Sequence, residues 1–150
     1  MLFLLFQLGA DRYALDASRV VEVLPLLGLK PIPNAPPEVA GMFSYRGETV
    51  PAVDLKHLIT GQPARERFAT RIIVVQHPGP NGQNRRLGLI AENVTQMVRK
   101  AEGDFQDTVP RLNSAPFLGP ALLDEHGVLR QLREDRLLTN DVRDVLFPAA

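Results

Sequence analysis

The sequence predicts a mostly β protein made of small barrels, with a helix at its C-terminal end. Three observations favour this fold class. Many short apolar segments are separated by Gly, Pro and Asn, the chain carries a weak internal repeat, and 45% apolar and 23% charged residues are typical of a small globular domain. At 150 residues the chain can bury one sizeable core, or two small cores that share an interface.

The predicted strands are short, and most of them end at a turn signal. In chain order they cover residues 2–8, 13–17, 20–24, 42–46, 49–53, 71–76, 85–91, 118–123 and 128–132. The segment 20–24 is equally compatible with a helical turn, and residues 94–98 form a further apolar run. Loops are expected at 78–84, at 100–116, and from Leu29 to Pro37, where four prolines disfavour regular structure.

Helical signals are few. Asp54 can cap a helical turn at residues 55–59, because its carboxylate can accept a hydrogen bond from a backbone N–H of the first turn. Residues 36–39 can form a single turn, since Pro is tolerated at the first helical position. A longer helix is expected from about Glu134 to Phe147.

Two segments of the chain repeat. Residues 12–24 align with 86–98, and residues 41–59 align with 119–138 if one extra residue is allowed in the second turn. Small and apolar positions coincide: Ala14 with Gly88, Leu15 with Leu89, Ala17 with Ala91, Val20 with Val94, Val23 with Met97, and Val53 with Leu132. An apolar β-rich chain produces part of such a match by chance. The repeat nevertheless favours a single domain, 1–150, of two similar subdomains at about 12–65 and 70–138. The N- and C-terminal segments would pack across them, and the polar linker at 61–70 would be the seam.

Composition and motif content argue against several function classes. A formal net charge of zero and a pI of about 6.8 argue against nucleic acid or an anionic membrane as partner. Without Cys there is no disulfide, thiolate nucleophile or zinc–thiolate site. The three His residues are scattered, and the loop at 79–82 lacks the Lys-Ser/Thr end of a phosphate-binding loop. We therefore expect no catalysis, no cofactor and no metal.

Two further features have simple interpretations. Asp54 and His57 have the spacing of an Asp–His pair, but no Ser or Cys nucleophile lies in a recognisable elbow, so a helix cap is the favoured interpretation. The apolar run Leu2–Phe6 is too short to cross a membrane and lacks the flanks of a signal peptide. A cytoplasmic protein without direct membrane insertion is expected.

The segment from Val39 to Leu58 is the most informative part of the chain. A short apolar run follows Gly41, and Arg46-Gly47-Glu48 indicates a tight turn, because Gly tolerates the positive φ that such turns require. Residues 49–53 then form a β-rich return strand. The sequence thus predicts a hairpin with a guanidinium group at its tip, which is a feature of a binding surface.

This pattern resembles the segment that marks CheW-like chemotaxis adaptor domains: a Gly, four or five residues, Arg-Gly, and a strand ending in Pro-x-x-Asp-Leu. Further matches cover nearly the whole chain: Tyr13-Ala-Leu-Asp16, Val20-Val-Glu-Val23, Pro33-x-x-Pro36-x-x-Val39-x-Gly41, Leu87-Gly-Leu-Ile90 and Val94. Two places depart from the family pattern. Ser44-Tyr45 stands where Asn-Leu is usual, and Arg133 stands where an acid is usual. The resemblance implies two five-stranded SH3-like barrels around a shared core, related by a pseudo-twofold repeat.

The resemblance also implies a set of receptor- and kinase-binding residues: Val20, Glu22, Gly41, Met42, Arg46, Gly47, Val94 and Met97. Each has a simpler alternative. Arg46 is otherwise a solvated turn charge or a brace for the surface, and Glu22 an outward-facing polar residue of its strand. The two glycines satisfy backbone geometry whether or not they border a groove. The four apolar residues are candidates for a groove between the barrels, with core packing as the alternative.

For function, the resemblance implies a non-catalytic adaptor. It would couple the cytoplasmic hairpin tips of methyl-accepting chemoreceptors to the regulatory domain of a CheA-type histidine kinase, and would associate with membrane receptor arrays through these partners. The alternative is a stand-alone β-barrel interaction module that regulates another signalling protein outside such an array. The pathway, its output, the cognate receptor, a main or auxiliary role, and the oligomeric state stay open.

Overall fold

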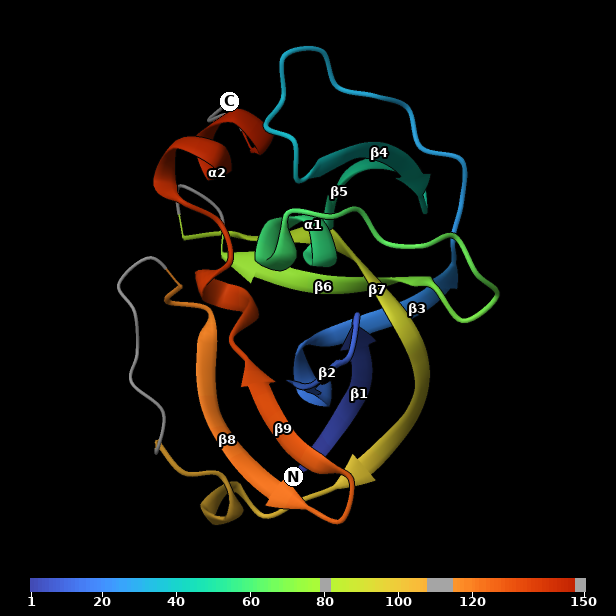
Figure 1. The fold of residues 1–150 in the computed structure, drawn as a ribbon. Coiled ribbons are helices and arrows are strands. Elements are labelled where there is room, and N and C mark those ends of the chain that lie inside the picture. The colour runs from blue at the N-terminus through green and yellow to red at the C-terminus, as the bar shows by residue number, and fades with distance from the viewer. Residues whose placement is uncertain (79–81, 108–114, 148–150) are drawn as a thin grey trace.

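The computed structural model describes residues 1–78, 82–107 and 115–147, so the expected loops at 78–84 and 100–116 lie partly outside the described residues. The described chain is mostly β with a few short helices (Figure 1). The strands are β1 (Leu2–Leu8), β2 (Asp11–Asp16), β3 (Val20–Pro25), β4 (Val39–Tyr45), β5 (Glu48–Asp54), β6 (Arg71–Pro78), β7 (Asn84–Arg99), β8 (Leu118–Asp124) and β9 (Gly127–Leu132). The described helices are two short α-helices, α1 (Leu55–Thr60) and α2 (Asn140–Leu146), and three 3₁₀ turns, Ala17–Arg19, Glu102–Asp104 and Glu134–Arg136.

Strand pairing forms two groups that share one long strand. In the first group the order is β4-β5-β7-β6-β3, and in the second it is β7-β1-β2-β9-β8. The two groups meet in β7, whose first half pairs with β5 and β6 and whose second half pairs with β1. Figure 1 shows β7 running from the upper group to the lower one. The predicted strand at 85–91 and the apolar run at 94–98 are therefore one continuous element.

The sequence repeat is also a repeat of strand pairing. Val23 pairs with Ile73, and its aligned residue Met97 pairs with Leu4. In the same way, Ala52 pairs with Gly88 in one group and Gln131 pairs with Ala14 in the other. The division into subdomains at 12–65 and 70–138 stays a prediction. Strand pairs such as Val20 with Val75 join the two halves of the chain across the 61–70 seam.

The largest hydrophobic cluster, here called the central core, lies between the two strand groups. It takes Leu4 and Leu15 from the second group and Ile73 and Leu89 from the first, each less than 5% exposed. A smaller cluster packs on the far face of each group. Alternate residues of β1 and β6 face different clusters, since Ile73 and Val75 point into the central core while Ile72 and Val74 point away from it. Burial on both faces explains why these strands are continuous apolar runs.

The helical predictions have mixed outcomes. The capped turn after Asp54 is confirmed as α1, whose His57 N–H donates to Asp54 Oδ1 at 3.2 Å. The single helix predicted from Glu134 to Phe147 is wrong in extent, because a 3₁₀ turn and α2 replace it. Leu137 between them is buried in the central core, and Thr139 adopts an extended conformation to cap α2. The ambiguous 20–24 segment is a strand.

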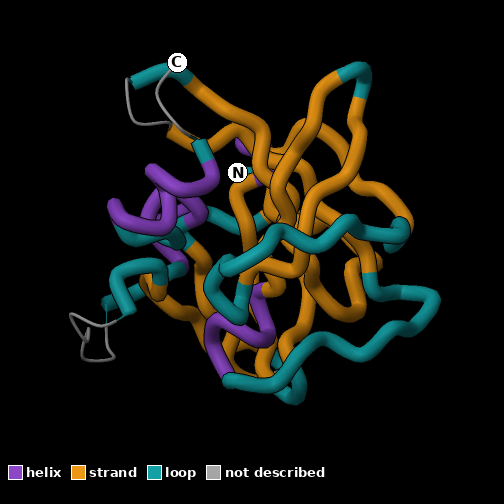
Figure 2. The backbone as a smooth tube through the Cα atoms, turned by 90° about the horizontal axis from the view of Figure 1, so that it is seen from above, coloured by secondary structure: helices purple, strands orange, loops and turns teal. Residues whose placement is uncertain are grey.

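Helices occupy the periphery of the molecule. Seen from above, strands fill the centre while the helical turns lie at the outside (Figure 2). Over the residues that the structure describes, no helix has the length and apolar character needed to cross a lipid bilayer.

Candidate protein-interaction surface

The β4–β5 hairpin ends in a two-residue turn formed by Arg46 and Gly47. Their φ angles are +50° and +78°, and two positive values in succession match a turn whose twist suits the flanking strands. The predicted tight turn is therefore present. The positive φ of Arg46 was not predicted, and for a residue with a Cβ it costs about 1–2 kcal/mol. The turn projects the Arg46 side chain outward, with 64% of it exposed.

The structure brings Glu22 and Arg46 together. Oε1 of Glu22, on β3, accepts a hydrogen bond from the Tyr45 hydroxyl at 2.5 Å and one from Arg46 Nη2 at 3.0 Å. The bond to Glu22 raises the pKa of the Tyr45 phenol. The two sequence segments expected to form the partner-binding surface are thus adjacent, and they are joined to each other by side-chain hydrogen bonds.

Two guanidinium groups lie over the ring of Tyr45. The Cζ atoms of Arg46 and Arg86 lie 5.2 and 5.3 Å from the ring centroid, within cation–π range. Arg86 also forms a long ion pair of 3.8 Å with Glu48. We call Glu22, Tyr45, Arg46, Glu48 and Arg86 the hairpin cluster. It combines two acids and two cations around one tyrosine.

Sequence reasoning missed three members of this cluster: Tyr45, Arg86, and Glu48, which it treated only as part of the turn. Tyr45 occupies the position where the chain departs from the family pattern, and this departure was the available signal. Arg86 had no such signal, because it lies 40 positions further along the chain and reaches the hairpin only through the β5–β7 pairing. Its contact with Tyr45 depends on the order of strands in the first group.

Gly41 has a steric role. Its φ is +145°, and a Cβ at this position would lie 2.6 Å from the carbonyl oxygen of Lys30. The next residue, Met42, exchanges two backbone hydrogen bonds of 2.9 Å with Lys30 and is half-buried. These contacts attach the proline-rich segment to the edge of β4. Gly47 has open space around it but needs its positive φ.

The apolar candidates differ in their exposure. Val94 is 1% exposed and belongs to the central core, and its carbonyl accepts a hydrogen bond from the Arg71 guanidinium at 2.8 Å. Val20 packs partly against the same core. Met97 is 48% exposed on β7, so it is available at the surface. An apolar groove that all four candidates line stays a prediction, and core packing accounts for Val94.

An apolar hollow of about 450 Å³ lies beside the end of β3, and we call it the β3 hollow. It is lined by Val23, Leu24, Leu26 and Phe68 together with Arg67 and Arg71. Phe68 is 93% exposed, and the Arg71 guanidinium lies 5.8 Å from its ring. An aromatic side chain so exposed beside an apolar hollow is typical of a protein-interaction site. A lone Phe within the polar 61–70 linker was the sequence signal for it.

Two site types considered from the sequence, an Asp–His pair and a metal site, have direct structural readings. Asp54 accepts a hydrogen bond from the backbone of His57, so their spacing is that of a helix cap, as the sequence favoured. Within the described ranges, His, Asp and Glu side chains form no group of three or more suited to hold a metal ion.

Comparison with known proteins identifies the family and two relatives that this chain resembles. Residues 2–142 match the CheW-like domain. The chemotaxis protein CheW of Treponema pallidum is 29% identical over 131 residues, which cover 84% of this chain and 71% of that protein. The chemotaxis protein CheW of Klebsiella aerogenes is 26% identical over 145 residues, covering 96% and 80%.

A solved structure supports the fold. The scaffolding protein TtCheW from Thermoanaerobacter tengcongensis superposes with a TM-score of 0.80 at 23% sequence identity, covering 94% of this chain and 89% of that one. This likeness establishes the fold, and the domain match covers nearly all of the chain. The chain therefore belongs to the CheW-like domain family, as its sequence predicted.

Proposed function

We propose that this protein is an adaptor that couples the cytoplasmic hairpin tip of a methyl-accepting chemoreceptor to the regulatory domain of a CheA-type histidine kinase. We place it in the cytoplasm, at receptor arrays. We also propose that its two strand groups are two SH3-like barrels related by a pseudo-twofold axis. The observation that carries the proposal is the hairpin cluster, which displays oriented charged groups on a family-matched surface. No bond is made or broken, and the output depends on which partners are held together.

The hairpin cluster is suited to meet the receptor. Arg46 donates one N–H hydrogen bond to Glu22, so its other N–H donors can bind a carboxylate or an exposed carbonyl. Glu22 is 39% exposed and keeps acceptor capacity of its own. Because acids and cations balance, we attribute specificity to the direction of these hydrogen bonds. The β3 hollow, on the same strand as Glu22, adds apolar contact area.

A second surface is suited to meet the kinase. Leu123 and Val128 face each other across the β8–β9 hairpin and are 79% and 55% exposed. β8 also ends the strand order of its group, so it lies at a sheet edge. Exposed apolar pairs at a sheet edge favour association with another β surface. We infer that this hairpin contacts the regulatory domain of the kinase.

The receptor test uses the receptor's cytoplasmic fragment and calorimetry. We expect Arg46→Ala and Glu22→Gln each to weaken binding by about tenfold or more, because a charge-assisted hydrogen bond contributes about 1.5–3 kcal/mol. Glu22→Gln keeps an acceptor for the Tyr45 hydroxyl, so it tests the charge without leaving that hydroxyl unpaired. Arg136→Ala, an exposed arginine on the 3₁₀ turn after β9, is the matched control.

Thermal melting separates binding from bracing. Both variants should melt close to the unmodified protein, since substitutions of exposed side chains usually change stability by about 0.5 kcal/mol. If both bind the receptor normally, the receptor surface lies elsewhere. If Arg46→Ala melts far earlier, Arg46 is a structural brace and its loss of binding says nothing about contact.

The kinase arm uses the isolated regulatory domain. We expect binding in the micromolar range, about 8 kcal/mol, that is weakened by Leu123→Ser and retained by Leu27→Ser, a control of 40% exposure outside this hairpin. If neither kinase nor receptor fragment binds, the adaptor proposal fails. A module acting on a different signalling protein would then be the better account.

A further inference from the structure

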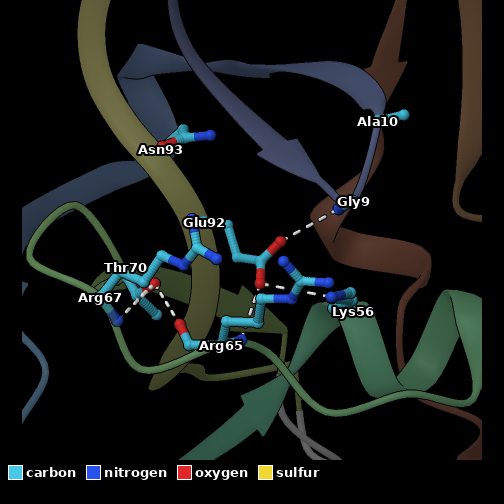
Figure 3. A pocket seen from close by; sticks show the side chains of 8 residues that line it. All are labelled: Gly9, Ala10, Lys56, Arg65, Arg67, Thr70, Glu92 and Asn93. Atoms are coloured by element: carbon cyan, nitrogen blue, oxygen red, sulfur yellow. Dashed lines mark hydrogen bonds and ion pairs between the residues drawn. The ribbon is translucent and has the colours of Figure 1, made fainter.

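A polar pocket of about 370 Å³ lies where the loop after α1 crosses the middle of β7 (Figure 3). Its lining includes Lys56, Arg65, Arg67, Thr70 and Glu92. We call it the basic pocket. It belongs neither to the hairpin cluster nor to the exposed pair on the β8–β9 hairpin, but it shares Arg67 and Thr70 with the lining of the β3 hollow. A ligand here goes beyond the proposed adaptor function, and its test measures anion binding and not receptor binding.

The floor of the basic pocket is polar and buried. Lys56 and Glu92 are each 9% exposed, and Thr70 is 2% exposed. Buried polar groups cost free energy unless they are paired, so such a floor is a built feature of the fold. The Thr70 hydroxyl is already committed, since it donates to the carbonyl oxygen of Arg65 at 2.5 Å.

The carboxylate of Glu92 is hydrogen-bonded through both of its oxygens within the protein. It accepts hydrogen bonds from the backbone N–H groups of Gly9 (3.0 Å) and Arg65 (2.7 Å), and from Lys56 Nζ at 3.4 Å. Burial alone would raise the pKa of Glu92. The two backbone bonds and the charge of Lys56 outweigh it, so the pKa is lowered and the group stays ionised. Glu92 therefore orders the loop and holds Lys56 in place.

Two guanidinium groups remain without a partner. Figure 3 shows the side chains of Arg65 and Arg67 extending from the loop toward Glu92, on the same side as Lys56. Over the described ranges of the chain, neither guanidinium makes a hydrogen bond or an ion pair, and both side chains are exposed. Lys56 Nζ has three donors and uses one of them in a long bond.

The charge balance of the pocket is strongly one-sided. Three cations line it against one carboxylate, which leaves two excess positive charges in a chain whose formal net charge is zero. Glu66 lies between the two arginines in sequence but is not among the lining residues. Electrostatic attraction to Lys56 is stronger than in bulk water, because this side chain is shielded from solvent.

We propose that the basic pocket binds an oxyanion, a phosphate or carboxylate group held by Arg65, Arg67 and Lys56. Planar guanidinium forks match the paired oxygens of both groups, and a compact ammonium adds a point charge. The excess positive charge excludes a cationic ligand. Glu92 positions Lys56 and the backbone of Arg65 and makes no contact with the anion.

Titration with simple anions tests the site. Inorganic phosphate and acetate are each added at an ionic strength matched with sodium chloride, and the amide resonances of Gly9 and Arg65 are followed by NMR. We expect saturable shifts with at least one of the two anions. The double variant Arg65→Gln, Arg67→Gln should weaken that binding by about tenfold or more, while Arg85→Gln, an exposed arginine outside the pocket, should bind normally.

The outcomes are distinct. Saturation by phosphate alone identifies a phosphate site, and saturation by acetate identifies a carboxylate site of the kind an acidic side chain would fill. The NMR spectrum of the double variant reports directly whether it is folded. Shifts that are linear in anion concentration and equal to those with chloride overturn the proposal, as does a folded double variant that binds like the unmodified protein.

Discussion

At the scale of single residues, Tyr45 organises the hairpin cluster. The side chain is buried in the smaller hydrophobic cluster of the first strand group, and its hydroxyl donates a hydrogen bond to Glu22. The guanidinium groups of Arg46 and Arg86 lie over its ring. A leucine, usual in the family at this position, has no hydroxyl and could not bind Glu22. This substitution therefore fixes the orientation of the two charged side chains that we assign to receptor binding.

Tyr45→Phe should lower the stability of the protein by about 1 kcal/mol, because it removes one hydrogen bond to a partly exposed carboxylate that water can solvate again. The urea midpoint of unfolding measures it. Tyr13→Phe is the matched control, since Tyr13 is equally buried at 5% exposure and stacks on Phe6, and no side-chain hydrogen bond of its hydroxyl is seen among the described residues. Equal midpoints for the two variants would mean that the bond to Glu22 adds nothing to stability.

At the scale of elements, caps fix where the short helices begin. Asp54 ends β5 and starts α1, with Oδ1 accepting from His57 N–H and Oδ2 from Ala64 N–H at 2.9 Å. One buried carboxylate thus joins a strand, a helix and the start of the 61–70 linker. Thr139 caps α2 at the surface with a single bond of 3.3 Å to Val142 N–H.

Asp54→Ala should therefore cost more than Thr139→Ala. We expect Asp54→Ala to lower the free energy of unfolding by about 2–3 kcal/mol, because it removes a cap worth about 1 kcal/mol and leaves the Ala64 N–H group without its partner. Thr139→Ala should lower it by about 1 kcal/mol or less. Denaturant unfolding of both variants under the same conditions makes the comparison. A larger loss for Thr139→Ala would show that α2, and not the β5–α1 junction, is the critical helix start.

At the scale of the whole molecule, ion pairs between distant segments tie the second strand group together. The two terminal guanidinium nitrogens of Arg12, on β2, donate to the two carboxylate oxygens of Asp124, at the end of β8, at 2.8 and 2.9 Å. The hydrogen bonds from Arg12, against the opposing effect of burial, lower the pKa of Asp124 from 3.8 to about 2. The carboxylate thus holds its charge in the folded protein at a pH that would protonate it in the unfolded chain.

The sign of this shift gives a pH dependence. Because the folded pKa is depressed, the stabilisation is fully present above about pH 4 and is lost as the pH falls from 3.8 toward about 2. Asp124→Asn should therefore be less stable than the unmodified protein above pH 4, and the difference should shrink through this window. Urea unfolding at a series of pH values measures it, with Asp144→Asn, an exposed acid of α2, as control. A difference that is constant with pH would rule out the ion pair as its cause.

The sequence alone determined the features that are encoded locally. Apolar runs located the strands, Gly47 located the turn, and Asp54 located a helix start. Each depends on backbone preferences or on the direction of a side chain relative to its own strand, which neighbouring residues specify. The family pattern also drew attention to Glu22 and Arg46 before any contact between them was visible.

Only the tertiary structure decided which of these elements lie side by side. β7 joins both strand groups, so Arg86 reaches Tyr45, and Glu92 receives hydrogen bonds from residues 83 and 27 positions away. The order β2-β9-β8 likewise brings Arg12 to an acid 112 positions away. The tertiary structure also decided that Val94 lies in the central core and that the helix predicted from Glu134 to Phe147 is interrupted at Leu137. These outcomes depend on strand order and on burial in a shared core, which are properties of distant parts of the chain together and have no local sequence pattern.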